Sequence, residues 1–221
     1  MTPLLRYQAA LLLRSHRWLP PLLLYAFVLA IGVWSAQPVL GSLGWTAGAV
    51  LPAAAWLARV CVLAEPPAAR AVTAAAAGPV RAQLARVLTG LGASLLIGTA
   101  GSLITTVISA PSDDAHRVRV PLGAAAAAGW LATLACVLLG TAVGVLSNPP
   151  VLRRPGWAVP VSALAAISLL VAAGSPANAA VSGLVTGSAT GRVTLPWLPV
   201  LVAAAGCAAA TALNCRLAPR R

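Results

Sequence analysis

The sequence predicts an all-α integral membrane protein with six transmembrane helices, on three observations. Of its 221 residues, 60% are hydrophobic and only 8% are charged, whereas about a quarter of a soluble domain is charged. The charges cluster and leave five windows without Asp, Glu, Lys or Arg, at residues 18–58, 87–112, 120–152, 155–191 and 193–215. Each window exceeds the roughly 20 residues that a helix needs to cross the hydrocarbon core, and two can cross twice.

Turn residues and aromatic residues divide these windows into six predicted spans within one transmembrane domain, residues 1–221. The spans are expected at about residues 18–35, 44–64, 87–108, 121–146, 157–173 and 196–215. We expect the first to be retained rather than cleaved as a signal, because no short basic segment precedes it and no small-residue cleavage site with a soluble domain follows.

The second span contains an arginine. A helix ending at Ala58 would have about 14 residues, too few to cross, whereas continuing to Ala64 gives ~30 Å at 1.5 Å per residue. Arg59 then lies close to the cytoplasmic end, where its guanidinium can reach the interface. A pairing or substrate-binding role inside the membrane is the alternative.

The distribution of arginine predicts which side each loop faces. All fifteen basic residues are Arg, and twelve fall in alternate segments: Arg6, Arg14, Arg17, Arg59, Arg70, Arg81, Arg86, Arg153, Arg154, Arg216, Arg220 and Arg221. Loops rich in Arg stay in the cytoplasm, so both termini are predicted inside and Asp113 and Asp114 outside. The net charge of +12 then reflects topology and the anionic inner leaflet of a bacterial cytoplasmic membrane, and we expect no nucleic-acid partner.

The residues that several chemistries require are missing. There is no G-x-x-x-x-G-K-[ST] sequence and no lysine, which excludes ATP hydrolysis by a P-loop. No Asp, Glu or His falls within a predicted span, which argues against a pump or a proton-coupled carrier. The two histidines are far apart and the four cysteines form no C-x-x-C pair, so we predict no metal, cofactor or disulfide site, and no enzyme.

Three basic segments flank the predicted spans. The stretch "LLRYQAALLLRSHRW" predicts an interfacial helix over residues 4–17, with Arg6, Arg14 and Arg17 on one face and apolar side chains on the other. An ordinary basic flank that orients the first span is the alternative.

The second basic segment, residues 65–86, predicts a short helix. Pro67 suits the first turn of a helix over about 67–77, and Gly78-Pro79 ends it before a new helix runs into the third span. The third basic segment, "SNPPVLRRPG" at residues 147–156, is a shorter turn bounded by prolines.

Small-residue spacings occur at Gly44/Gly48, Gly140/Gly144, Gly183/Gly187 and Gly187/Gly191. Such spacings let helices approach closely, and packing within the chain explains most cases. The stretch "TGLGASLLIGTAGSLITT" could border a transport path or form packing faces.

An N-terminal interfacial helix, six spans with both ends inside and two structured cytoplasmic turns together resemble the permease subunit of an ABC transporter of the type-2 exporter class. The stretch "RYQAALLLRSHRWLPPLLLY" is also similar in its general composition to small actinobacterial permeases. The resemblance covers nearly the whole chain and is architectural, because the class has no sharp sequence signature. It implies an ATP-driven exporter with a separate ATPase chain and a second copy of this chain or a paralogue.

The resemblance also implies roles for individual segments. Residues 65–86 and 147–156 would dock on the ATPase, and the helix at about 67–77 would be the main coupling helix rather than a plain connector. The residues predicted to couple to the ATPase are Arg70, Val72, Ala74, Arg153 and Arg154. The outer segment 174–195 would dip back into the outer leaflet, with a flexible outer loop as the rival. The alternative function is a non-transporting accessory or assembly protein with another cytoplasmic partner.

Overall fold

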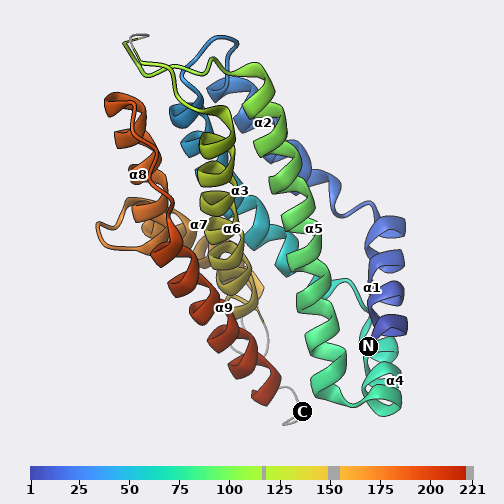
Figure 1. Cartoon of the computed structure of the whole chain (residues 1–221). Coiled ribbons are helices and arrows are strands. Elements are labelled where there is room, and N and C mark those ends of the chain that lie inside the picture. Colours follow the sequence, from blue (N-terminus) through green and yellow to red (C-terminus); the bar gives the residue numbers. More distant parts are fainter. Residues whose placement is uncertain (116–117, 149–154, 218–221) are drawn as a thin grey trace.

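The computed structural model confirms the all-α prediction. It describes residues 1–115, 118–148 and 155–217, and these form helices without any strand (Figure 1). The helices of this part of the chain are α1 (Thr2–Ser15), α2 (Leu19–Gly32), α3 (Val39–Leu63), α4 (Pro67–Ala77), α5 (Pro79–Ile108), α6 (Leu122–Leu146), α7 (Pro155–Val171), α8 (Pro176–Thr190) and α9 (Trp197–Leu217).

Among the described helices, four are long and apolar enough to cross a membrane: α3, α5, α6 and α9. They match the second, third, fourth and sixth predicted spans. A fifth crossing exists if α7 and α8, which are bent by 45° at their junction, count as one broken span. The predicted first span corresponds to α2, whose 14 residues extend for only about 21 Å, less than the hydrocarbon core. Six spans are therefore not confirmed.

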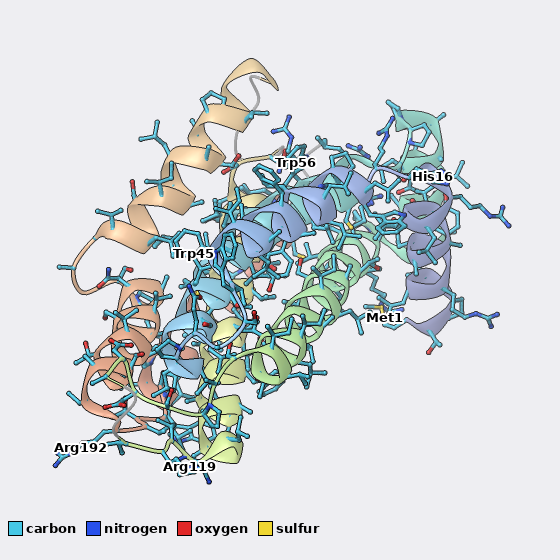
Figure 2. The ribbon with its side chains drawn as sticks, turned by 90° about the horizontal axis from the view of Figure 1, so that it is seen from above. Met1, His16, Trp45, Trp56, Arg119 and Arg192 are labelled. Carbon is cyan, nitrogen blue, oxygen red and sulfur yellow. The ribbon has the colours of Figure 1, made fainter. Side chains whose placement is uncertain are left out.

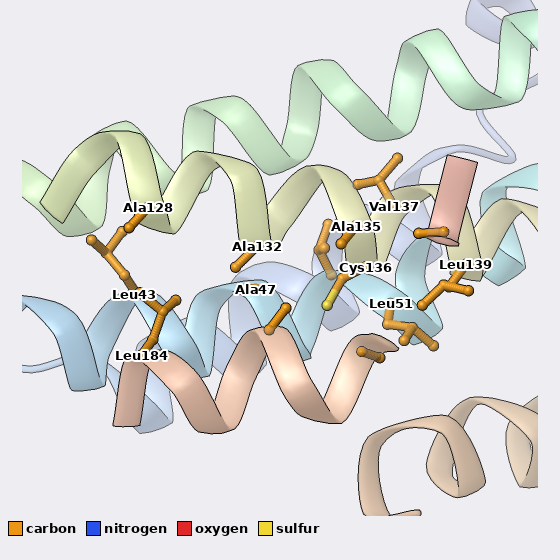
Figure 3. Close-up of a cluster of buried hydrophobic side chains, with 14 of the residues drawn as sticks. Leu43, Ala47, Leu51, Ala128, Ala132, Ala135, Cys136, Val137, Leu139 and Leu184 are labelled. Atoms are coloured by element: carbon orange, nitrogen blue, oxygen red, sulfur yellow. The ribbon is translucent and has the colours of Figure 1, made fainter. Parts of the chain in front are cut away.

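The helices α3 and α6 form the centre of the bundle. In their most apolar stretches 61% and 78% of the residues are buried, against 28% for α5 and 33% for α9. Their contact is made largely of small side chains, such as Ala47, Ala132 and Ala135, with Leu43 and Leu51 filling the space between them (Figure 3).

Two glycines set the distance between α3 and α6. A Cβ atom at Gly144 would lie 2.3 Å from the main-chain oxygen of Ala55, and one at Gly140 would lie 2.4 Å from that of Leu51. The backbones of the two helices thus touch directly, as a small-residue spacing allows. The predicted role of the Gly140/Gly144 spacing is confirmed.

We expect Gly144→Ala to lower the free energy of unfolding by about 1–3 kcal/mol, because the new methyl group meets a main-chain carbonyl and the helices must separate. Gly206→Ala in α9 is the matched control, since nothing lies within 4 Å of its Cβ position. That control should be neutral or slightly stabilising. Thermal unfolding midpoints in detergent measure both, and equal midpoints would show that α3 and α6 do not approach as described.

Hydroxyl pairs join α5 to the two central helices. The hydroxyls of Thr46 and Thr105 lie 2.8 Å apart, and those of Ser102 and Thr133 also lie 2.8 Å apart, all four buried. Interhelical hydrogen bonds of this kind hold apolar helices together. For these positions of the stretch "TGLGASLLIGTAGSLITT" the packing alternative therefore holds.

The short helix predicted at 67–77 is confirmed as α4. Pro67 lies in its first turn. Gly78 ends the helix with φ 84°, a backbone conformation that residues other than glycine rarely adopt. Pro79 then begins α5, so the chain turns sharply between two helices. Viewed from above, α1 with Met1 and His16 lies on the same flank as α4, and Arg119 and Arg192 lie on the opposite side (Figure 2).

Candidate functional site

The helix α4 lies on the flank of the bundle, at the end where α1 begins and α9 ends (Figure 1). It packs against α5, and none of its side chains is buried. The prolines and the glycine at its ends leave it attached along one side only. It therefore presents a complete second face to its surroundings.

That second face consists of small apolar side chains. They are exposed, recur every three or four residues, and are Ala68, Ala71, Val72, Ala75 and Ala76. The side chain of Val72 is 67% exposed. We call this set the apolar face of α4. It carries no charge.

The predicted coupling residues lie on both sides of α4. Val72 belongs to the apolar face, whereas Arg70 and Ala74 are half-buried on the side that faces the bundle. Arg70 donates a hydrogen bond from Nη2 to the main-chain oxygen of Glu65, 3.1 Å away, so it contacts its own chain. Arg153 and Arg154 lie outside the described residues.

The predicted interfacial helix is present as a helix, α1, which packs against α5. The helix ends at Ser15, short of the predicted residue 17, because His16 takes a left-handed conformation, so only Arg6 and Arg14 belong to α1 and Arg17 lies in the turn after it. All three arginines are exposed, while Gln8 and Leu12 are buried. The side of α1 opposite the arginines therefore faces the protein.

A buried ion pair lies where α3 ends and α4 begins. Arg86 of α5 donates to the same carboxylate oxygen of Glu65 from Nη2 at 2.6 Å and from Nε at 3.0 Å. The side chains are 5% and 0% exposed, respectively. Two charges removed from water are stable only when the geometry is good and their remaining polar atoms are bonded.

Those remaining atoms do find partners. Thr73 of α4 donates to the second carboxylate oxygen of Glu65 at 3.0 Å. The Nη1 of Arg86 donates to Gln83 at 2.9 Å, and Gln83 in turn donates to Asn214 of α9 at 2.6 Å. Asn214 donates to the main-chain oxygen of Val145 in α6 at 3.2 Å.

We call Glu65, Thr73, Gln83, Arg86 and Asn214 the Glu65 network. Its hydrogen bonds connect α4 to α5, α9 and α6 through a continuous chain of polar groups. Such a fully bonded network holds its members in one arrangement, because breaking any link leaves a polar group buried without a partner.

The helix α1 also reaches this network. The pKa of Tyr7 is raised first by burial, and then by the charge of Glu65 and by a hydrogen bond to that residue. The charge of Arg86 lowers the same pKa. The carboxylate of Glu65 thus favours the protonated form of the Tyr7 hydroxyl. The helix α1 itself packs against α5, the helix that carries Arg86.

The Glu65 network was not among the predicted sites. The sequence did carry one signal for it: Glu65 is the only acidic residue away from Asp113 and Asp114. A single carboxylate among several arginines is strongly attracted to their guanidinium groups. Asn214 near the end of the last apolar window was a second, weaker signal.

At the opposite end of the bundle, the other two acids tie α8 to the loop before α6. Asp113 is buried and accepts a hydrogen bond from the main-chain N–H of Val118 at 3.1 Å. The hydroxyl of Ser188 in α8 donates to the carboxylate of Asp114, whose own N–H donates to the main-chain oxygen of Ser188 at 3.1 Å.

None of the protein-family models, curated proteins or solved structures compared with this chain matches it.

Proposed function

We propose that this chain is the membrane-spanning permease subunit of an ATP-driven exporter, and that α4 docks on a separate ATPase chain. The observation that carries the proposal is the apolar face of α4, five small exposed side chains on a helix held at one end of the bundle. At 11 residues α4 is far too short to cross a membrane. An exposed and contiguous set of apolar side chains favours burial against a partner.

The small size of these side chains suits a protein partner. Alanines allow another backbone to approach closely, and Val72 supplies one larger side chain at the centre of the face. Lipid as the partner would favour long apolar side chains that reach the acyl region, as on the exposed surfaces of α5 and α9, where Leu96 and Leu198 are 75% and 74% exposed.

The Glu65 network supports the same proposal. A helix that receives force from an ATPase must be attached firmly to the transmembrane helices, otherwise it would move alone. The hydrogen bonds from Thr73 and Arg86 to Glu65, and from Gln83 to Asn214, supply such an attachment to α5 and α9. Movement of α4 is then transmitted to the bundle.

In this proposal six segments cross a bacterial cytoplasmic membrane with both termini in the cytoplasm. The segments of α2 and α7 count as the first and fifth spans, α1 lies in the inner interface, and α8 dips into the outer leaflet. One chain supplies half of a path, and a second copy or a paralogue supplies the rest. The largely exposed surface of α7 over residues 159–171 is available for that second chain.

Affinity purification of the tagged full chain from its native membrane, in mild detergent, tests the proposal. We expect an ATPase chain with nucleotide-binding motifs to co-purify, with two copies of each by native mass spectrometry. Val72→Arg should abolish co-purification and leave the unfolding midpoint unchanged, because Val72 is exposed and arginine suits a helix. Arg81→Gln, an exposed change beside α4, is the matched control. A stable monomer without an ATPase would favour the accessory-protein function instead.

A further inference from the structure

Among the described residues, Arg6 and Arg14 of α1, and Arg17 in the turn after it, form no ion pair with an acidic side chain. The chain has fifteen arginines but only three acidic side chains. Glu65 is buried against Arg86, and Asp113 and Asp114 bind the loop and α8 at the other end of the bundle. No acidic side chain is therefore left to pair with these exposed arginines, and they are available to an anionic molecule outside the chain.

The exposed surface of α1 combines these charges with apolar groups. Arg6, Arg14 and Arg17 are exposed, and Leu13 beside them is 63% exposed. We call these three arginines and Leu13 the basic face of α1, of which Arg17 lies in the turn that follows the helix. Guanidinium groups interspersed with a large apolar side chain match the boundary between lipid headgroups and acyl chains.

The position of α1 also favours a lipid over an acidic protein. Only residues 16–18 separate α1 from α2, and residue 18 is a tryptophan, a residue type enriched at membrane interfaces. The basic face is therefore held at the edge of the apolar part of the bundle. The small apolar face of α4 has the opposite character, so the two helices suit different partners.

We infer that the basic face of α1 binds the phosphate groups of anionic phospholipids. Arginine binds phosphate through two parallel hydrogen bonds as well as by charge. Each basic residue near an anionic surface strengthens binding by about fivefold, so three together strengthen it on the order of a hundredfold. The inference does not depend on the proposed ATPase partner.

The test is a titration of the purified full chain in detergent with phosphatidylglycerol and, separately, with phosphatidylcholine, followed by native mass spectrometry. We expect the wild-type chain to retain phosphatidylglycerol preferentially. The triple variant R6Q/R14Q/R17Q should lose most of that preference, on the order of a hundredfold. The triple lysine variant R6K/R14K/R17K should keep part of it, because it keeps the charge and loses the paired hydrogen bonds.

Two controls separate this result from a change of fold or orientation. R119Q/R192Q removes two exposed arginines from the opposite side (Figure 2) and should keep the wild-type preference. A cysteine introduced at position 75, in a chain lacking its four native cysteines, should remain inaccessible from outside in every variant. If the glutamine variant fails to fold, the lysine variant and the wild-type titration still decide. Equal retention of the two lipids by the wild-type chain, or an unchanged preference in R6Q/R14Q/R17Q, would overturn the inference.

Discussion

Glu65→Ala is expected to lower the free energy of unfolding by about 3–5 kcal/mol, because it leaves the guanidinium of Arg86 buried without its carboxylate. The pair is almost completely enclosed, with exposed fractions of 5% for Arg86 and 0% for Glu65. For a chain of this size the loss corresponds to a midpoint roughly 10 °C lower. The seven tryptophans allow it to be followed by intrinsic fluorescence in detergent.

The double variant Glu65→Met with Arg86→Met is the matched comparison. Replacing both charges with apolar side chains of similar volume is often neutral or stabilising, so its midpoint should return close to that of the wild type. It nevertheless lacks the hydrogen bonds to Thr73 and Gln83, so coupling between α4 and the bundle should be weakened. A Glu65→Ala chain as stable as the wild type would mean that water, rather than Glu65, solvates Arg86.

Ala74→Pro is expected to cost α4 about 3 kcal/mol of helix stability, because proline removes a main-chain hydrogen bond and clashes with the preceding turn. Ala74 lies in the last turn and a half of α4, and its main-chain oxygen accepts the N–H of Gly78 that closes the helix. The transmembrane helices and the arginine count are unchanged, so insertion and expression should survive. If the proposed function is right, co-purification of an ATPase, or hydrolysis stimulated by a transported compound, should collapse.

Ala74→Ser is the control for this experiment. It alters the same side chain and keeps the main-chain N–H, so assembly with the ATPase should persist. If Ala74→Pro also assembles and transports normally, α4 is a plain connector between α3 and α5. Comparing Ala74→Pro with Val72→Arg then shows whether assembly depends on the helical conformation of α4 or on its apolar face.

Hydropathy and turn residues alone were sufficient for much of the architecture. The predicted spans at 121–146 and 196–215 correspond to α6 (Leu122–Leu146) and α9 (Trp197–Leu217). The helix predicted at 67–77 is α4, because Pro67 and Gly78 act on the backbone beside them and need no distant partner. These features are local, and a sequence reports local free energies directly.

The first predicted span differs in length from the helix found there. An apolar window at 18–35 predicted a crossing helix, whereas α2 ends at Gly32 after 14 residues. Hydropathy reports that a segment avoids water, but it does not report where its helix begins or how it packs. The turn at His16, with φ 53°, separates α1 from α2 and sets that beginning.

The sequence by itself therefore determined the helical class, four helices long and apolar enough to cross a membrane, and the presence of α4. Only the tertiary structure decided that Arg86 pairs with Glu65, 21 residues away, and that Gln83 bonds to Asn214, 131 residues away. No periodicity relates such positions, because their partners are chosen by how α5 and α9 pack. Burial then enforces the choice, since an unpaired charge or amide in that environment costs more free energy than the fold can lose.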